Sequence, residues 1–249
     1  MTRESYAKIN WSLRITGRRA DGFHDLETVF QTISLHDTLT FNRGDGLSLT
    51  CSDPTIPIDE TNLVLRAARA AGAENLAIHI EKRIPAGGGL GGGSSDAAAT
   101  LIELGKPDPA MALSLGSDVP FFLGGGTAYA TGRGEILTPL PPMAGIPLLL
   151  VLPPEKVLTR DAFALVTRYS EPLGIDAHRD FANFTNDFEE PVFALLPRLR
   201  TLKQRLIDAG AMWAGMSGSG STLVGAFDSA QARDAVVFDD VRTERCVTI

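Results

Sequence analysis

The chain contains, from Pro85 to Asp96, the stretch Pro-Ala-Gly-Gly-Gly-Leu-Gly-Gly-Gly-Ser-Ser-Asp. Six of the seven residues 87–93 are glycine, a composition that costs backbone entropy and offers almost no side-chain surface for packing. A fold keeps such a run where the backbone must approach another group closely. The alanine-rich pattern over residues 97–104 predicts a helix directly after the run, capped by Ser94, Ser95 or Asp96. Because free N–H groups and the positive end of a helix dipole would meet there, we predict an anion-binding site.

The sequence of this glycine-rich loop can be compared with four known kinds of glycine-rich segment, of which three match it poorly. A flexible linker rarely leads through two serines into a good helix. A P-loop ends in Gly-Lys-Ser or Gly-Lys-Thr, which this loop does not contain. Residues 87–92 match the dinucleotide pattern G-x-G-x-x-G, but the density of glycine makes that match uninformative. The order Pro-x-x-x-Gly-Leu-x-x-x-Ser-Ser instead resembles the second motif of the GHMP kinase superfamily, whose loop wraps the phosphates of ATP.

The composition excludes several classes of protein. The 249 residues suffice for one large or two small domains, 44% are hydrophobic and the mean hydropathy is +0.05. No apolar run reaches the ~20 residues of a membrane helix, and the N-terminus shows no apolar signal core, so we expect a cytoplasmic protein with no membrane partner. The formal charge of −7 argues against nucleic-acid binding. The two cysteines and four histidines show no metal-binding spacing, so no metal ligand is identified.

The segment before the loop and the N-terminal segment both have strand patterns. Residues 76–84 alternate apolar and polar side chains and predict a half-buried strand that leads into the loop. Residues 7–16 alternate loosely and predict another strand. Lys8 and Asn10 would lie on one face of it, because side chains two positions apart point the same way. Such a pair forms either a solvated face or the wall of a site.

Two further segments have features of a site. Asp118 stands in the sequence Gly-Ser-Asp-Val-Pro-Phe-Phe over residues 116–122. There it is either a turn residue or a partly desolvated carboxylate that acts as a base. Residues 216–221 read Met-Ser-Gly-Ser-Gly-Ser before a strand pattern, and form either a second loop of close approach or a tight turn. A proline cluster over residues 139–147 is the best candidate for a domain boundary.

Three further segments have the pattern of helices. Residues 61–71 predict a helix with Asp59 or Thr61 as its candidate cap. Residues 161–169 and 192–209 predict two more helices, the second interrupted near Pro197.

Six segments taken together narrow the interpretation. They are Ala-Lys-Ile-Asn at 7–10, Gly-Arg-Arg-Ala-Asp-Gly-Phe-His at 17–24, the glycine-rich loop, Leu-Gly-Ser-Asp-Val-Pro-Phe at 115–121, Gly-Arg-Gly-Glu at 132–135 and Ser-Gly-Ser-Gly-Ser at 217–221. In this order they resemble the 4-diphosphocytidyl-2-C-methyl-D-erythritol kinase family of the GHMP kinase superfamily. The resemblance implies a two-domain α+β GHMP kinase fold. Residues 1–143 would form an N-terminal ribosomal-protein-S5-like α/β domain, and residues 144–249 a C-terminal ferredoxin-like α+β domain.

The resemblance also implies a reaction. The family phosphorylates the C2 hydroxyl of 4-diphosphocytidyl-2-C-methyl-D-erythritol with ATP, in the non-mevalonate pathway to isoprenoid precursors. At the matching positions, Asp118 would be the general base. Lys8 would lie beside Asp118, hold the carboxylate in its charged form and orient the hydroxyl. Most of the acceleration would come from alignment and charge neutralisation.

The same resemblance assigns the residues that bind ATP. Backbone N–H groups of the glycine-rich loop would wrap the phosphates, and either Ser94 or Ser95 would contact Mg²⁺. The nucleotide-binding positions are Asn62, Leu63, Lys82, Pro85, Gly87, Gly88, Gly89, Leu90, Gly91, Gly92, Gly93, Ser94 and Ser95.

The substrate-binding residues follow from the resemblance as well. The cytosine would lie between the rings of Phe23 and Phe163 and would be read by His24, an arrangement suited to the flat face of a neutral base. The remaining substrate-binding positions are Asn10 and Thr159, at the sugar-alcohol end or the diphosphate, and Ser217 and Gly218, which would help to close the site. Phe23 stands where the family usually has Tyr, so stacking is kept while a phenolic hydrogen bond is lost.

The sequence leaves two other functions open. One is another GHMP kinase that acts on homoserine, mevalonate or a sugar. The segment Asp-Gly-Phe-His at residues 21–24 argues against it, because those substrates contain no cytosine. The other is a nucleotide-binding sensor without catalysis, against which the presence of both Lys8 and Asp118 argues. The segment before Asp118 and the chain as a whole are short for the family. We expect a monomer or a weak homodimer.

Overall fold

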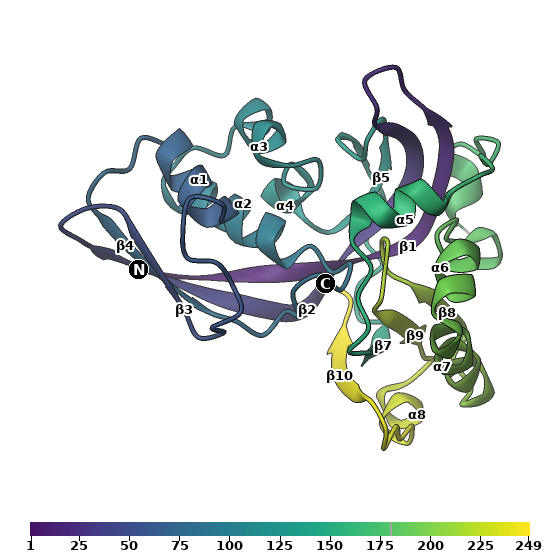
Figure 1. Ribbon diagram of the computed structural model, residues 1–249. Coiled ribbons are helices and arrows are strands. Elements are labelled where there is room, and N and C mark those ends of the chain that lie inside the picture. Colours follow the sequence, from purple (N-terminus) through teal and green to yellow (C-terminus); the bar gives the residue numbers. More distant parts are fainter. Residues whose placement is uncertain (180) are drawn as a thin grey trace. The chain divides into compact units, whose positions relative to one another are not determined.

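A computed structural model describes residues 1–179 and 181–249, and the chain divides into two compact units (Figure 1). The first unit comprises Met1–Ala7, Leu35–Ala86 and Gly91–Gly125. The second unit comprises Lys8–Ser34, Gly87–Leu90 and Gly126–Ile249. The glycine-rich loop therefore contributes residues to both units. In the described ranges, no helix combines the length and the apolar character needed to cross a membrane.

The elements follow one another as a mixture of strands and helices. The strands are β1 (Thr2–Arg18), β2 (His24–Arg43), β3 (Ser48–Cys51), β4 (Leu76–Glu81), β5 (Thr127–Thr131), β6 (Ile136–Pro139), β7 (Pro147–Leu152), β8 (Trp213–Met216), β9 (Leu223–Ala226) and β10 (Arg242–Val247). The helices are α1 (Leu63–Ala70), α2 (Gly92–Glu103), α3 (Pro109–Leu115), α4 (Phe121–Gly124), α5 (Thr159–Leu165), α6 (Glu189–Leu195), α7 (Pro197–Asp208) and α8 (Ala230–Asp234), with 3₁₀ turns at Ile175–Arg179 and Phe181–Asn183.

In the first unit, α1 and α2 pack on the strands β2, β3 and β4 (Figure 1). Strand β4 pairs antiparallel with β2 and parallel with β3. Ile78 and Ile80 of β4 are buried while Glu81 is exposed, so the predicted alternation is confirmed. Ala97 and Ala98 of α2 are fully buried in a cluster with Ala67 of α1. Small side chains at these positions let the two helices approach closely.

The caps of these two helices differ from the sequence-based expectation. Helix α2 begins at Gly92 after Gly91, whose φ of +71° is left-handed, and no side chain caps it. The expectation that Ser94, Ser95 or Asp96 caps the helix is therefore wrong. Glycine makes the turn by its backbone alone, because it adopts positive φ without a steric penalty. Helix α1 is capped by Asn62, whose side chain accepts a hydrogen bond from Val64 N at 2.9 Å, so the expected cap by Asp59 or Thr61 is wrong.

In the second unit, four antiparallel strands form a sheet in the order β10-β7-β9-β8. Helices α5, α6 and α7 bury apolar side chains against it in one core, which includes Leu149, Val151, Phe193 and Leu206. Strand β5 joins the N-terminal part of β2 in this unit and β6 pairs with β5. The arrangement places helices on one side of an antiparallel sheet, as an α+β domain requires.

Two helices of the second unit differ in extent from what their sequence suggests. A helix predicted over residues 161–169 is observed as α5, which ends at Leu165 because Val166 is extended. A helix predicted over residues 192–209 with a break near Pro197 is observed as α6 and α7, so the break is confirmed. Proline is tolerated in the first turn of α7, where its missing N–H would have no partner.

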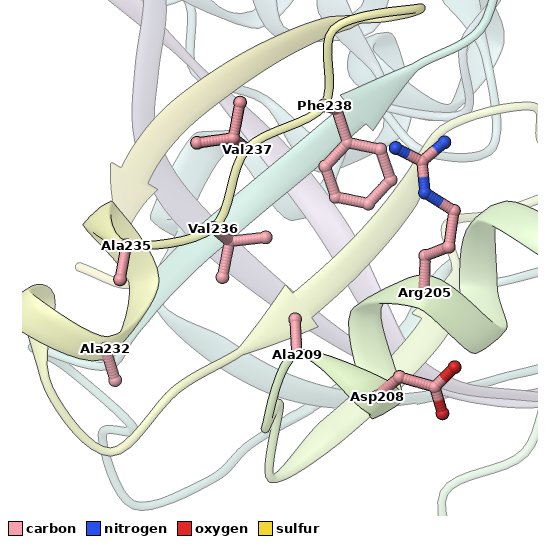
Figure 2. A pocket seen from close by; sticks show the side chains of 8 residues that line it. All are labelled: Arg205, Asp208, Ala209, Ala232, Ala235, Val236, Val237 and Phe238. Atoms are coloured by element: carbon pink, nitrogen blue, oxygen red, sulfur yellow. The ribbon is translucent and has the colours of Figure 1, made fainter.

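A pocket of about 420 Å³ lies between the C-terminal end of α7 and the segment that runs from α8 toward β10 (Figure 2). Its walls are formed by Arg205, Asp208, Ala209, Ala232, Ala235, Val236, Val237 and Phe238. The guanidinium of Arg205 stacks over the ring of Phe238, 4.1 Å from its centroid. The expected site residues do not line this pocket.

Candidate active site

The second part of the glycine-rich loop, from Gly91 onward, belongs to the first unit and forms the start of α2. The Ser95 hydroxyl is buried and donates to the carbonyl oxygen of Tyr6 at 2.6 Å, while Ser5 Oγ donates to Ser95 Oγ at 2.9 Å. The Ser94 side chain is half-buried, and its hydroxyl makes no hydrogen bond within the described part of the chain. The two serines therefore differ: Ser95 anchors the helix to β1, and Ser94 is left available.

Several expected nucleotide-binding residues meet at this helix start. A Cβ atom added to Gly92 would lie 2.9 Å from Lys82 Nζ, and one added to Gly93 would lie 4.0 Å from Leu63 Cδ1. Asn62 caps α1 and donates to Pro57 O at 2.7 Å. The structure thus brings Leu63 and Lys82 beside the first residues of α2. Glycine is required at Gly92, because a side chain there would collide with the lysine ammonium.

Lys82 itself is held by two buried carboxylates. Its Nζ donates to Asp37 Oδ2 and, at 3.0 Å, to Asp96 Oδ2, and its side chain is only 6% exposed. Burial raises the pKa of Asp96 to about 6, against the opposing charge of Lys82. Burial alone would lower the pKa of Lys82, but the charges of Asp96 and Asp37 outweigh it and raise that pKa above its ordinary value. Lys82 is therefore charged at neutral pH.

The first part of the glycine-rich loop contacts the Ser-Gly-Ser loop in the second unit. Ser217 Oγ donates to Gly89 O at 2.9 Å, and Thr222 N donates to Gly88 O at 3.3 Å. A Cβ atom on Gly89 would lie 2.0 Å from Ser217 O, and one on Gly218 would lie 3.3 Å from Gly89 O. Close approach of two backbones explains the glycine density in both loops.

Lys8 and Asn10 lie together on β1, as the strand alternation predicts. Lys8 Nζ donates to Asn10 Oδ1 at 2.6 Å, and Asn10 Nδ2 donates to Thr28 Oγ1 at 2.7 Å. The Lys8 ammonium also lies 5.3 Å from the centroid of the Phe30 ring. Asn10 N donates to Ser217 Oγ at 3.3 Å. Both side chains are buried, so of the two interpretations of this pair the solvated face is wrong.

Two of the three expected cytosine-binding side chains are in contact. The ring of His24 stacks on that of Phe163, with centroids 4.6 Å apart and planes 13° apart. Phe163 is supported edge-on by the buried Phe188 at 4.8 Å. Burial, together with the charge of Arg18, lowers the pKa of His24 below its ordinary value of 6.5. His24 is therefore neutral at pH 7 and offers both a donor and an acceptor.

The third side chain, Phe23, is packed differently. The residue is 49% exposed, and its ring lies under the Arg133 guanidinium, which is 4.3 Å from the ring centroid. The backbone N–H of Arg133 is bound by the carboxylate of Glu135 at 2.5 Å. The Gly-Arg-Gly-Glu segment therefore supports Phe23, a function that the sequence did not indicate.

Two further expected residues are Thr159 and Asp118. Thr159 is exposed in the first turn of α5, and its Oγ1 lies 3.1 Å from Ser219 Oγ. Asp118 is half-buried in the turn over residues 117–120 that precedes α4, in the first unit. Lys8 belongs to the second unit, so the expected pairing of Lys8 with Asp118 stays a prediction.

Comparison with known proteins shows which family the chain belongs to. A model of the GHMP kinases N terminal domain matches residues 62–107, and a model of the GHMP kinases C terminal region matches residues 170–238. The 4-diphosphocytidyl-2-C-methyl-D-erythritol kinase of Chlorobium phaeobacteroides (strain BS1) is 42% identical, over 93% of this chain and 90% of the relative. The chain belongs to the 4-diphosphocytidyl-2-C-methyl-D-erythritol kinase family. The kinase of that name from Protochlamydia amoebophila (strain UWE25) is 41% identical, over 88% of this chain and 81% of the relative.

A solved structure agrees with this family assignment. The crystal structure of a 4-(cytidine 5'-diphospho)-2C-methyl-D-erythritol kinase is 34% identical, with a TM-score of 0.84 over 100% of this chain and 99% of the other. The α+β, two-domain GHMP kinase fold expected from the sequence is thereby confirmed. As a member of this kinase family the chain is an ATP-dependent small-molecule kinase.

Two residues that sequence reasoning missed hold distant segments of the second unit in place. Asn186 Nδ2 donates to Met216 O at 2.6 Å and to Gly218 O at 2.8 Å, so it holds the Ser-Gly-Ser loop. Glu27 is buried and accepts hydrogen bonds from Tyr129 Oη at 2.6 Å and Leu173 N at 2.8 Å. Neither residue could be found from a local sequence motif, because each binds a segment that is more than 25 positions away. Only the tertiary structure reveals such contacts.

Proposed function

We propose that this chain transfers the γ-phosphoryl group of ATP to the C2 hydroxyl of 4-diphosphocytidyl-2-C-methyl-D-erythritol, in the non-mevalonate pathway. One observation carries the proposal. A relative of that name is 42% identical along nearly the whole of both chains. The solved structure of a kinase of this substrate adds support, because it superposes over the entire chain.

The start of α2 supports phosphate binding. No side chain caps this helix in the described part of the chain, and the first N–H groups of a helix have no intrahelical partner. A phosphate oxygen satisfies such groups and is favoured by the positive end of the helix dipole. The close fit of Gly92 against Lys82 leaves the backbone, rather than side chains, to face the nucleotide. We therefore assign residues 87–95 to the triphosphate, and Asn62 and Leu63 to the rest of the nucleotide.

For Mg²⁺, we propose Ser94 as the protein ligand rather than Ser95. The Ser95 hydroxyl is buried and donates to Tyr6 O, whereas the Ser94 hydroxyl is available. Among the described residues, no group of three or more His, Cys, Asp or Glu side chains can hold a metal ion. Phosphate oxygens, which are usual ligands of Mg²⁺ in kinases, would then complete its coordination. When bound, the ion neutralises charge on the β- and γ-phosphates.

For the chemical step, we propose Asp118 as the general base. The C2 oxygen attacks the γ-phosphorus, the bond from that phosphorus to the bridging oxygen breaks, ADP leaves, and the hydroxyl proton passes to the carboxylate. Lys8 supplies a positive charge that favours the ionised carboxylate and orients the hydroxyl. Its ammonium is directed by Asn10, which is held in turn by Thr28. This chain of hydrogen bonds fixes the lysine before substrate binds, so alignment is not lost to side-chain motion.

For selectivity, we propose that His24 and the rings of Phe23 and Phe163 recognise cytosine. A neutral imidazole has one donor and one acceptor, and the pairing edge of cytosine offers both kinds of partner. The exposed face of Phe23 is available for stacking with a flat base. Thr159, Ser217 and Gly218 are assigned to the remainder of the substrate.

The same proposal includes a cytoplasmic location, a monomer or weak homodimer, no nucleic-acid partner and a domain boundary between residues 143 and 144. The formal charge of −7 supports the absence of a nucleic-acid partner.

Product analysis tests the proposed function. The purified chain is incubated with ATP, Mg²⁺ and 4-diphosphocytidyl-2-C-methyl-D-erythritol, and ADP and the organic product are quantified by mass spectrometry. We expect one ADP for each substrate molecule that gains one phosphoryl group. Binding of ATP without any phosphorylated product would instead identify a nucleotide sensor.

A further inference from the structure

Asp37 of β2 is a buried carboxylate at the base of the glycine-rich loop, in the first unit. Its side chain is 0% exposed. Its Oδ2 accepts from Lys82 Nζ, and its Oδ1 accepts from the backbone N–H groups of Arg83 at 2.6 Å and Ile84 at 2.8 Å. All of these partners are in three consecutive residues, directly before Pro85. A buried charge is retained only when it is paired and hydrogen-bonded, and Asp37 meets both conditions.

The Asp37 carboxylate binds two backbone N–H groups that lie just beyond the last paired residues of β2 and β4. The pairing of β2 with β4 stops at Thr38 and Glu81. The N–H groups of Arg83 and Ile84 lie beyond it, and Asp37 Oδ1 accepts both of them. The carboxylate thus holds the chain in the turn that leads from β4 into the loop.

The same turn contacts the helix that follows the loop. A Cβ atom on Gly92 would lie 2.9 Å from Lys82 Nζ and 3.0 Å from Ile84 Cγ2. Asp96 of α2 takes the second hydrogen bond of the Lys82 ammonium, at 3.0 Å, and is itself bound by Ser5 Oγ at 2.6 Å. Lys82 therefore bridges β2 and α2, and the entry and the exit of the loop are tied to one buried ion cluster.

We infer that Asp37 is a positioning residue for the nucleotide: it acts through Lys82 and the backbone of residues 83–84 to hold both ends of the glycine-rich loop. The inference rests on the proposed binding of ATP at this loop. An ammonium at the N-terminal end of a helix opposes the helix dipole, so Lys82 occupies this place only because the two carboxylates compensate for it. Without the charge of Asp37, the ammonium and the loop lose their fixed position.

The test compares Asp37→Asn with Asp45→Asn, which removes the same charge from an exposed residue of the same unit. Binding of a non-hydrolysable ATP analogue is measured by calorimetry, and the KM values for ATP and for the alcohol substrate are measured separately. We expect Asp37→Asn to raise the dissociation constant and the KM for ATP at least tenfold, while the KM for the alcohol changes less than threefold. Asp45→Asn is expected to match the wild type in all three.

Two outcomes overturn the inference: an unchanged affinity for the ATP analogue in Asp37→Asn, or equal increases in both KM values. If the wild type itself does not bind the analogue, the proposed function fails and the inference with it, so the two failures are distinguished. If Asp37→Asn does not fold, the double variant Asp37→Asn/Lys82→Met returns the ion cluster to its wild-type net charge, and Lys82→Met alone is its control because Lys82 is itself an expected nucleotide-binding residue. Weaker binding by the double variant than by Lys82→Met supports the inference, and equal binding by the two contradicts it.

Discussion

Replacing Gly89 with alanine tests the close approach of the two glycine loops in the second unit. Gly89 has a φ of +79°, and its added Cβ would lie 2.0 Å from Ser217 O. Gly87 has a φ of +68°, but its added Cβ would meet only Cδ of Lys156, at 3.6 Å. Gly87→Ala is therefore a matched control, because it carries the same backbone strain without the collision.

The magnitude follows from these contacts. A left-handed residue with a Cβ costs roughly 1–2 kcal/mol, which both variants bear. In Gly89→Ala the Ser217 carbonyl must also move by about 1 Å to relieve the overlap. That shift breaks the hydrogen bond from Ser217 Oγ to Gly89 O and strains the one from Asn10 N, at about 1 kcal/mol each. We expect Gly89→Ala to lose about 2 kcal/mol more than Gly87→Ala.

Two assays measure this difference. Urea unfolding gives the free energy of unfolding of each variant, and calorimetry gives the affinity for a non-hydrolysable ATP analogue. If the collision destabilises only the ATP-bound conformation of the loop, the extra 2 kcal/mol corresponds to about a thirtyfold higher dissociation constant for the ATP analogue. Equal stability and equal affinity of the two variants would contradict the expected collision, because both substitutions carry the same backbone strain.

Three further predictions concern catalysis, substrate recognition and pH. Asp118→Asn should lower kcat by at least about 10²-fold, the effect typical of a general base, and leave ATP affinity within a factor of about two; comparable turnover would remove Asp118 from the mechanism. Phe163→Ala should raise the KM for the cytidine substrate far more than the KM for ATP, and the opposite pattern would contradict the cytosine assignment. Burial raises the pKa of Asp96 from 3.8 to about 6. Between these two pH values the folded state keeps a proton on Asp96 that the unfolded state has lost, so the free energy of unfolding falls as the pH rises from 3.8 to 6. Asp96→Asn should remove that fall, which amounts to at most about 3 kcal/mol, in urea titrations at about pH 4 and pH 7; a wild type equally stable at both would contradict it.

Local sequence patterns predicted the strand, loop and helix around residues 76–104, because periodicity and glycine density are local signals. The same reasoning placed Lys8 and Asn10 on one face, and their side chains are 2.6 Å apart. It misplaced the cap of α2, because a left-handed glycine can start a helix without any side chain.

Non-local contacts account for what the sequence could not predict. Asp37 and Lys82 are 45 positions apart, and Asn186 holds a loop some 30 positions later. No pattern within either segment shows which partner the fold supplies. The difference between Ser94 and Ser95 is of the same kind, since it depends on the burial of Ser95 against Tyr6 of β1.

Selectivity of the purified chain among alcohols distinguishes the proposed substrate from those of other GHMP kinases. kcat/KM is measured with ATP and Mg²⁺ for 4-diphosphocytidyl-2-C-methyl-D-erythritol, homoserine, mevalonate and galactose under one set of conditions. We expect turnover with the cytidine compound alone. Turnover of another alcohol with an efficiency equal to or above that of the cytidine compound would contradict the proposed substrate.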